Sequence, residues 1–251
     1  MNPILVKQLA CDFCMSESEV TDNNSHFTIF QAHPERRVFK DTEHCFLKAA
    51  SVNGKILATG EAAIIRWCEE KFRDGNGAWF MDMETLRELD RKVSEYGYRI
   101  GQAHPFYIGE TITEIDTKGL DIRQFIGKDL EQFKGDDRFG EAFLFAECPK
   151  DEIGIGAYKN GQLLGMAGAT SDSDRMWQIG INVMKEAEGM GVGSMLVGLL
   201  KNEILSQNRL PFYGTSMSHI ASQKVALKAG FLPAWSELYC EKMEQEQTEA
   251  G

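Results

Sequence analysis

Three glycines at alternate positions, Gly189, Gly191 and Gly193, join an apolar run to an amphipathic segment. The run before them, residues 176–184, alternates in part as a strand does, and residues 193–207 have the apolar spacing of a helix. Glycines let the backbone turn without a side-chain clash and let its amides point in one direction. Together with the free amides and positive dipole end of the next helix, they predict a binding site for an anion, most often phosphate.

The spacing of this glycine loop excludes the two commonest nucleotide-binding loops. The dinucleotide pattern G-x-G-x-x-G needs a third glycine that neither reading frame supplies, and Leu196 holds the required position in one frame. A P-loop needs a lysine directly after its last glycine, whereas the next lysine here is Lys201. We therefore expect neither a Rossmann dinucleotide site nor a nucleotide triphosphatase.

Few ionisable side chains lie where they could transfer a proton near this loop. His219 stands at the start of a predicted helix, and its ordinary pKa near neutrality would suit a general base. The alternative for His219 is local hydrogen bonding at the helix start. Asp172 and Asp174 lie in the polar turn 171–175, which is typical of a solvated loop, although either could approach an amine from there.

The composition limits the classes of partner. The chain has 251 residues and a net charge of −11, which disfavours nucleic-acid binding because phosphate contacts need a surplus of Lys and Arg. There is no run of eighteen apolar residues and no basic-then-apolar leader, so we expect a cytoplasmic protein without a membrane partner. The acidic balance is compatible with a cationic substrate.

The cysteines predict neither a disulfide framework nor a metal centre. The chain contains six cysteines, several of them inside apolar runs, as reduced packing residues are. Cys11 and Cys14 have the C-x-x-C spacing of half a zinc site, but no second such pair exists in the sequence. Only the fold could bring His26, His33, His44 and Cys45 to them, and we predict no metal site.

The first hundred residues predict a small α+β domain. Residues 45–50 and 56–59 flank Asn53-Gly54, a typical hairpin turn, and helices follow over 61–72 and from 82 to about 97. Residues 101–105 have the composition of a connector. We therefore predict two domains, 1–104 and 105–251.

The second half predicts strands and helices in alternation. The clearest hairpin is 153–159 with 162–170, joined by Asn160-Gly161. Residues 142–148 fit either a strand or a helix end, since periodicity alone does not separate them. The other expected elements are a strand over 106–115, a helix over 121–133, a strand over 212–217, a helix from Ser218 to Ala229, and a strand over 231–243.

With these elements in order, residues 106–243 resemble the GNAT superfamily of acyl-CoA-dependent N-acyltransferases. The motif I-N-V-x-x-x-x-E-G-M-G-V-G-S is similar to that family's strand and its Q/R-x-x-G-x-G/A pyrophosphate loop. The motif H-x-x-S followed by K-A-G-F is similar to the family's N-x-x-S/A and K-x-G-F helix. The resemblance implies an α/β (α+β) fold, with a mixed, mostly antiparallel central sheet flanked by helices, preceded here by the smaller α+β domain.

The resemblance also implies an activity and a binding site. The implied activity is that of an N-acetyltransferase, which transfers an acetyl or short acyl group from acyl-CoA to a small-molecule amine or a peptide amine. Acetyl-CoA would be the co-substrate. The backbone of Ile181 and Val183 would lie beside the pantetheine arm. The other residues expected at the CoA site are Glu188, Gly189, Met190, Gly191, Val192, Gly193, Ser194, His219 and Ser222.

Three residues depart from the family pattern. Glu188 stands where relatives have Arg or Gln, and it would repel phosphate if it faced the ligand. Ala226 replaces a tyrosine that protonates the leaving thiolate, and His219 replaces an asparagine. The catalytic residues are therefore not identified; His219 and Asp174 are weak candidates.

These departures leave a second function open. The alternative is a CoA-binding regulatory or scaffold protein without turnover.

The N-terminal domain is expected to cover the acceptor site or to mediate homodimerisation.

Overall fold

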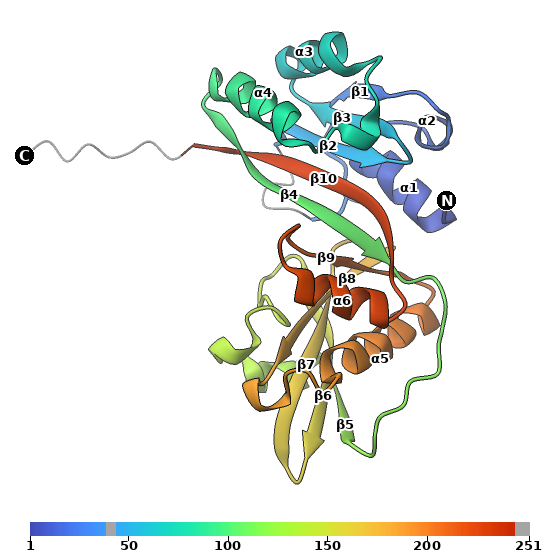
Figure 1. The fold of residues 1–251 in the computed structure, drawn as a ribbon, viewed down its shortest axis with the longest axis vertical. Coiled ribbons are helices and arrows are strands. Elements are labelled where there is room, and N and C mark those ends of the chain that lie inside the picture. The colour runs from blue at the N-terminus through green and yellow to red at the C-terminus, as the bar shows by residue number, and fades with distance from the viewer. Residues whose placement is uncertain (39–43, 244–251) are drawn as a thin grey trace, which may run out of the picture. The chain divides into compact units, whose positions relative to one another are not determined.

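The chain folds into two compact units, each assembled from segments far apart in the sequence (Figure 1). The structure is a computed structural model that describes residues 1–38 and 44–243. Within that range, unit 1 comprises residues 1–12, 33–38 and 105–234, and unit 2 comprises residues 13–32, 44–104 and 235–243. Both β4 (Tyr98–Ile108) and β10 (Leu232–Lys242) run from one unit into the other.

Unit 2 contains a sheet in the strand order β1-β3-β2-β10-β4. Strands β2 and β3 form the predicted hairpin, and its turn residues Asn53 and Gly54 have φ angles of 49° and 78°, as a type I′ turn requires. The other elements of this unit are α2 (Glu17–Thr21), β1 (His26–Ile29), β2 (Leu47–Val52), β3 (Lys55–Gly60), α3 (Ala62–Phe72), η1 (Gly77–Trp79) and α4 (Met83–Ser94).

Helices α3 and α4 bury one apolar face each against this sheet. Ile64, Ile65 and Cys68 of α3 and Leu89 and Val93 of α4 join one hydrophobic core with the strands. The spacing of these residues at three and four positions predicted both helices, and the structure confirms them.

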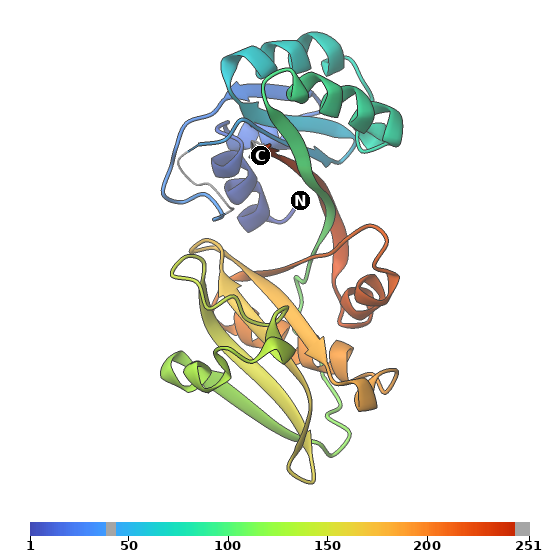
Figure 2. The same cartoon turned by 90° about the vertical axis from the view of Figure 1, so that its left-hand side faces the viewer.

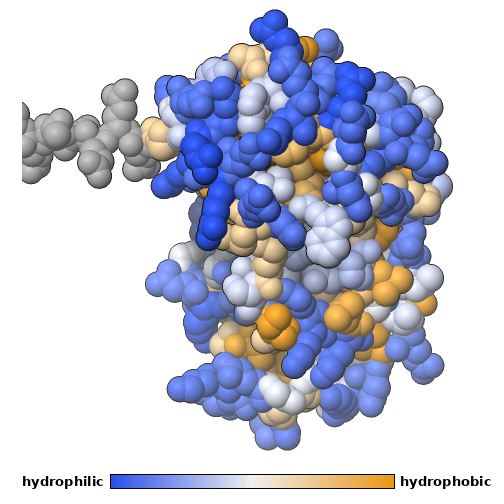
Figure 3. Space-filling model, turned by 45° about the horizontal axis from the view of Figure 1, so that its top comes forward, coloured by the Kyte–Doolittle hydropathy of each residue, from blue (hydrophilic) through white to orange (hydrophobic). Residues whose placement is uncertain are grey.

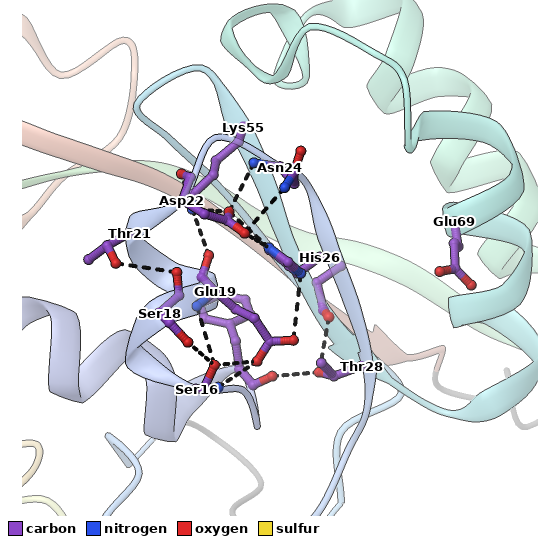
Figure 4. Close-up of polar contacts among 12 residues, drawn as sticks. Ser16, Ser18, Glu19, Thr21, Asp22, Asn24, His26, Thr28, Lys55 and Glu69 are labelled. Carbon is purple, nitrogen blue, oxygen red and sulfur yellow. Dashed lines mark hydrogen bonds and ion pairs between the residues drawn. The ribbon is translucent and has the colours of Figure 1, made fainter.

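A polar cluster ties α2 to β1 and β3 within unit 2 (Figure 4). Both carboxylate oxygens of Asp22 lie 2.9 Å from His26 Nε2. The ammonium of Lys55, which is almost fully buried, donates to the backbone oxygens of Glu19 and Asp22 at 2.7 and 2.8 Å. His26 is thus a partner of Asp22, which gives this histidine a structural role in the fold.

Unit 1 contains a sheet in the strand order β4-β9-β8-β7-β6-β5. Its neighbours pair antiparallel except for β8 with β9, which pair parallel. Its elements are α1 (Pro3–Asp12), β5 (Asp121–Ile126), η2 (Gly127–Phe133), η3 (Asp137–Phe139), β6 (Lys150–Lys159), β7 (Gln162–Ser171), β8 (Met176–Val183), η4 (Lys185–Ala187), α5 (Val192–Ser206), β9 (Leu210–Gly214) and α6 (Ile220–Lys228).

The two faces of this sheet are covered differently. Helices α5 and α6 pack on one face, where Trp177, Ile179 and Tyr213 join the main core of the unit (Figure 1). The segment after β5 lies on the other face and is visible in front of the sheet in Figure 2. The mixed, mostly antiparallel sheet flanked by helices confirms the predicted fold class.

Helix α1 is held to unit 1 by buried polar groups. Asp12 accepts hydrogen bonds from the backbone N–H and the Nε of Arg37, at 2.8 and 2.5 Å. Gln8 donates to Asp12 and accepts from the hydroxyl of Ser173 at 2.8 Å. Helix α1 was not predicted from the sequence, because its weak amphipathicity gives no clear periodic signal.

Three predicted elements were wrong, because contacts with other segments of the chain decide these regions. Residues 121–126 form β5 rather than a helix, because they pair with β6 and Gly127, at φ 57°, ends the strand. The expected strand 106–115 stops at Ile108, since the backbone N–H and C=O of Thr113 bond the side chain of Asn202. Residues 142–148 form neither helix nor strand, because two of their amides bond the carboxylate of Asp151.

Smaller differences concern connections and element ends. Residues 101–105, expected as a connector, lie inside β4, and the last strand spans 232–242. His219 rather than Ser218 is the N-cap of α6, and Gly230 follows the helix at φ 84°, as expected for a helix end.

The compact units differ from the two ranges 1–104 and 105–251. One crossing, between His104 and Pro105, coincides with the predicted junction. However, α1 belongs to unit 1 because Asp12 bonds Arg37 there, and residues 235–243 belong to unit 2 because β10 pairs with β2. The assignment of the two ranges as functional domains stays a prediction.

Hydrophilic side chains predominate on the face shown in Figure 3, with hydrophobic ones scattered among them. In unit 1 the exposed large apolar residues include Met190, Met217, Ile220 and Leu227. Within the described residues, none of the helices has the length and hydrophobicity needed to cross a membrane.

Replacement of Gly180 by alanine should destabilise unit 1, because its Cβ would lie 1.7 Å from the backbone oxygen of Glu141. We expect the free energy of unfolding to fall by about 2–4 kcal/mol, measured by urea denaturation followed by circular dichroism. Gly140→Ala is the matched control, since Gly140 has a helical φ of −63° and a Cβ there would meet only one atom, at 3.9 Å. A Gly180→Ala protein as stable as the control would contradict the close approach.

Candidate functional site

The glycine loop connects β8 to α5 as predicted. One 3₁₀ turn, η4, follows the strand, and then Gly189 and Gly191 take φ angles of 75° and 79°. Gly191 is the N-cap of α5, so the amides that follow it form the first turn of the helix and have no partner four residues earlier. The positive end of the helix dipole therefore faces out of the loop.

Gly193 lies in the first turn of α5, where packing leaves little room for a side chain. A Cβ at this position would lie 3.2 Å from Val183 Cγ2 and 3.4 Å from Val225 Cγ2. The first turn of α5 therefore packs directly on the end of β8 and on α6. This contact fixes the direction in which the loop amides point.

Lys118 brings a positive charge to the glycine loop. Its Nζ donates a 2.8 Å hydrogen bond to the backbone oxygen of Met190, and a Cβ on Gly191 would lie 3.0 Å from the same nitrogen. A tight turn positions this lysine: Lys118 has a φ of 55°, and its N–H donates to Asp116 Oδ1 at 2.8 Å. Lys118 was not predicted from the sequence, because 72 residues separate it from Met190.

Glu188, which departs from the family pattern, is exposed at the start of the loop. It lies between η4 and Gly189, with an extended backbone, and its N–H bonds the oxygen of Lys185. Lys118 therefore supplies a positive charge in the same loop where Glu188 supplies a negative one.

Strands β8 and β9 part beside this loop. Their parallel ladder ends at the pair of Gln178 and Phe212, although β8 continues to Val183 and β9 to Gly214. Ile181 and Val183, the residues expected beside the pantetheine arm, lie in the part of β8 that pairs with β7 but not with β9, and they are half-buried. Their side chains pack against the core that α5 and α6 cover.

The opposite face of β8 carries a backbone segment, residues 141–142. The amides of Glu141 and Ala142 donate to Asn182 Oδ1 at 3.0 and 2.8 Å. Gly180 and Gly168 permit this approach, since a Cβ on Gly168 would lie 1.9 Å from the oxygen of Ala142. The exposed Glu141 is thereby held at the edge where β8 leaves β9.

A pair of hydroxyls links the end of β9 to helix α6. The hydroxyls of Tyr213 and Ser222 lie 2.8 Å apart, so Ser222 joins the end of β9 to α6. Burial raises the pKa of Tyr213, with the hydrogen bond to Ser222 lowering it and the charge of Glu141 adding to the rise. Tyr213 was not among the residues predicted for the site; from the sequence it was expected only as part of the strand 212–217.

The two weak catalytic candidates lie apart from each other. His219 is exposed at the N-cap of α6, where its side chain makes no capping bond. Asp174 is exposed in the turn before β8, so the whole strand separates it from the glycine loop. Their catalytic role stays a prediction.

Asp172, in the same turn, is buried rather than solvated as expected, because it accepts a hydrogen bond from Thr170 at the end of β7. Burial raises its pKa to about 7, while the hydrogen bond from Thr170 and the charge of Arg37 oppose the rise. The Thr170 hydroxyl donates to Asp172 Oδ1 at 2.7 Å.

Among the histidines and cysteines weighed as metal ligands, the structure brings together Cys11 and His33, while Cys14 and His44 bond other residues. Cys11 Sγ lies 3.3 Å from His33 Nδ1, while Cys14 Sγ donates to the backbone oxygen of Gln31 and His44 pairs with Glu61. Burial raises the pKa of the Cys11 thiol to about 11, which disfavours the thiolate that a metal needs. In the described part of the chain, no group of three or more His, Cys, Asp or Glu residues could hold a metal ion.

Comparison with known proteins gives a family for part of unit 1. Residues 121–231 match the model of the acetyltransferase (GNAT) family. This range includes β8, the glycine loop, α5 and α6. No curated protein matches the chain.

Several solved structures are similar to the chain. A GCN5-related N-acetyltransferase from Kribbella flavida is 12% identical, with a TM-score of 0.47 over 64% of this chain and 65% of that protein. An acetyltransferase of the GNAT family from Colwellia psychrerythraea is 16% identical, with a TM-score of 0.42 over 58% and 57%. A GCN5-related N-acetyltransferase-like protein from Streptococcus suis 89/1591 is 12% identical, with a TM-score of 0.45 over 80% and 87%.

The chain spans less than two thirds of the Kribbella flavida and Colwellia psychrerythraea proteins. The family match has the position that the two sequence motifs predicted, in the C-terminal half. Residues 121–231 of this chain form a domain of the GNAT acetyltransferase family.

Proposed function

We propose that this protein is an N-acetyltransferase that transfers an acetyl or another short acyl group from acyl-CoA to an amine. Membership of residues 121–231 in the GNAT family supports acyl transfer in general. The observation that carries the finer proposal is the glycine loop at the start of α5, with Lys118 Nζ 2.8 Å from the oxygen of Met190. A backbone anion site and a fixed cation lie together at the end of β8.

The residues present fit the pyrophosphate of CoA. The first-turn amides of α5 and the left-handed glycines Gly189 and Gly191 give donors without side chains in front of them. Lys118 adds a charge-assisted donor, which binds phosphate oxygens more strongly than a neutral donor does. Ser194, whose hydroxyl lies 3.1 Å from the oxygen of Gly191, would contribute its backbone amide.

The parting of β8 from β9 suits the pantetheine arm. Beyond Gln178 the inner edge of β8 has no β9 partner, so its peptide groups are available to the amides of pantetheine. Ile181 and Val183 would lie beside the arm, and His219 and Ser222 start the helix on the other side of the opening. When bound, acyl-CoA supplies the thioester carbonyl that an amine attacks.

The task of this chain's residues is then mainly to orient the two reactants. Holding an amine next to a thioester converts a bimolecular step into an effectively unimolecular one. The backbone of β8 and the loop amides fix the donor. Residues 141–142, on the opposite face of β8, border the side from which an amine would approach.

Two measurements test the proposal. Isothermal titration with acetyl-CoA should show binding at one site, and a thiol-release assay over a panel of amines should show turnover with at least one amine. Absence of binding at millimolar acetyl-CoA would contradict the site. Binding without thiol release for every amine would favour a CoA-binding regulatory protein. This is the competing function, because Ala226 stands where relatives have a catalytic tyrosine.

Lys118→Ala should weaken acetyl-CoA binding by about 3- to 10-fold at low salt, because a partly screened charge interaction is lost. The effect should shrink as ionic strength rises. Lys159→Ala is the matched control, since Lys159 is an exposed lysine at the end of β6. Equal affinities of the two variants, measured by titration calorimetry, would remove Lys118 from the site.

Glu188→Gln should have the opposite effect and tighten binding by about 2- to 5-fold, since it removes a negative charge beside the phosphates. Glu186→Gln in η4 controls for the general change in net charge. If both variants bind acetyl-CoA as the unmodified protein does, Glu188 points away from the ligand.

A further inference from the structure

We propose that Tyr213 is the catalytic acid of this domain and that Ser222 positions it, in place of the tyrosine that Ala226 replaces. The proposal rests on the acyl-transfer function proposed above. It starts from the position of a buried phenol at the end of β9, where the parallel ladder with β8 has just ended.

The position of Tyr213 follows from strand geometry. Phe212 is the last β9 residue paired with β8, so Tyr213 is the first residue beyond the point of parting. Successive side chains alternate between faces, which puts Phe212 on the face opposite α5 and Tyr213 on the face that α5 and α6 cover. The phenol therefore lies on the same face as Ile181 and Val183.

Helix α6 connects this phenol to the glycine loop. The Tyr213 hydroxyl lies 2.8 Å from Ser222 Oγ. Val225, one turn further along α6, is the residue that a Cβ on Gly193 would approach to 3.4 Å. A chain of contacts therefore leads from Tyr213 through Ser222 and Val225 to the start of α5. The fully buried Ala226 follows Val225 in α6.

The other polar side chains near the point where β8 and β9 diverge are less suited to donate a proton. Asn182 accepts two backbone hydrogen bonds with its side-chain oxygen, and Gln178 has no ionisable group. His219 is exposed at the N-cap of α6. Tyr213 combines burial, an O–H donor and a fixed partner.

The proton transfer balances with Tyr213 as the donor. The reaction joins the amine nitrogen to the thioester carbonyl carbon and breaks the C–S bond, whose electron pair leaves on sulfur. Tyr213 Oη donates its proton to that sulfur, and the amine nitrogen releases one proton to water. The tyrosinate then regains a proton from solvent, with Ser222 Oγ as its hydrogen-bond partner in both states.

The surroundings of Tyr213 keep the phenol protonated at neutral pH. Burial and the charge of Glu141 raise its pKa above the ordinary value of 10.0, and the Ser222 hydrogen bond lowers it. Glu141 is the charged group that acts on this pKa, and Tyr107 is the β4 partner of Tyr213 in the ladder.

The test compares Tyr213→Phe and Ser222→Ala with Tyr158→Phe, which removes a hydroxyl from β6 in the same unit. With an amine that the unmodified protein acetylates, Tyr213→Phe should lower kcat by about 10²-fold or more. Acetyl-CoA affinity by calorimetry should stay unchanged, and the melting temperature should fall by only a few degrees, as expected when one buried hydrogen bond is lost. Ser222→Ala should lower kcat by about 3- to 10-fold, as expected when one neutral hydrogen bond is lost.

A spectroscopic titration separates catalysis from a structural role. The tyrosinate absorbance of the unmodified protein minus that of Tyr213→Phe gives the pKa of this phenol directly. Glu141→Gln should lower that pKa, because it removes a negative charge, and the alkaline limb of the kcat profile should move to lower pH by the same amount. The limb should be missing in Tyr213→Phe.

The outcomes distinguish this inference from the proposed function. Turnover that is unchanged in Tyr213→Phe, or an alkaline limb that does not follow the phenol pKa in Glu141→Gln, overturns the role of Tyr213 alone. Failure of the unmodified protein to acetylate any amine overturns the proposed function and the inference with it. Loss of acetyl-CoA binding in Tyr213→Phe would make the residue structural and contradict the acid role.

Discussion

The close packing of α5 on the end of β8 is the constraint on which the site depends. It is possible because Gly193 has no side chain between Val183 and Val225. Once the helix lies there, its first-turn amides and its dipole have a fixed direction relative to the strand. The two left-handed glycines before it, Gly189 and Gly191, bend the chain so that no Cβ stands in front of those amides.

The charge at this loop comes from a distant segment, residues 109–118. That segment is fastened along α5: the backbone of Thr113 bonds Asn202 in both directions, and the buried Lys201 donates to Thr113 Oγ1 at 3.0 Å. Its last part turns at Asp116 and delivers Lys118 to the loop. The loop that carries the acidic Glu188 therefore also receives a cation from a distant segment of the chain.

The opposite face of the sheet depends on glycines too, for a different reason. Gly168 and Gly180 lie side by side in β7 and β8, and the backbone of residues 141–142 occupies the space that their side chains would fill. Asn182 satisfies two amides of that segment, so a loop without regular structure is still held firmly. The ends of β8 and β9 thus have helices on one face and this loop on the other. Tyr213 lies where the two strands diverge.

The sequence by itself determined the strand, loop and helix around Gly189, Gly191 and Gly193, the hairpin at Asn160-Gly161 and the family motifs. These features are encoded by residues close together, through turn conformation and side-chain period. The sequence did not determine that residues 121–126 form a strand, that α1 joins unit 1, that Lys118 bonds Met190 or that Tyr213 bonds Ser222. Those outcomes depend on pairing, burial and hydrogen bonds between residues many positions apart, and local propensity is a weak guide wherever such contacts outweigh it.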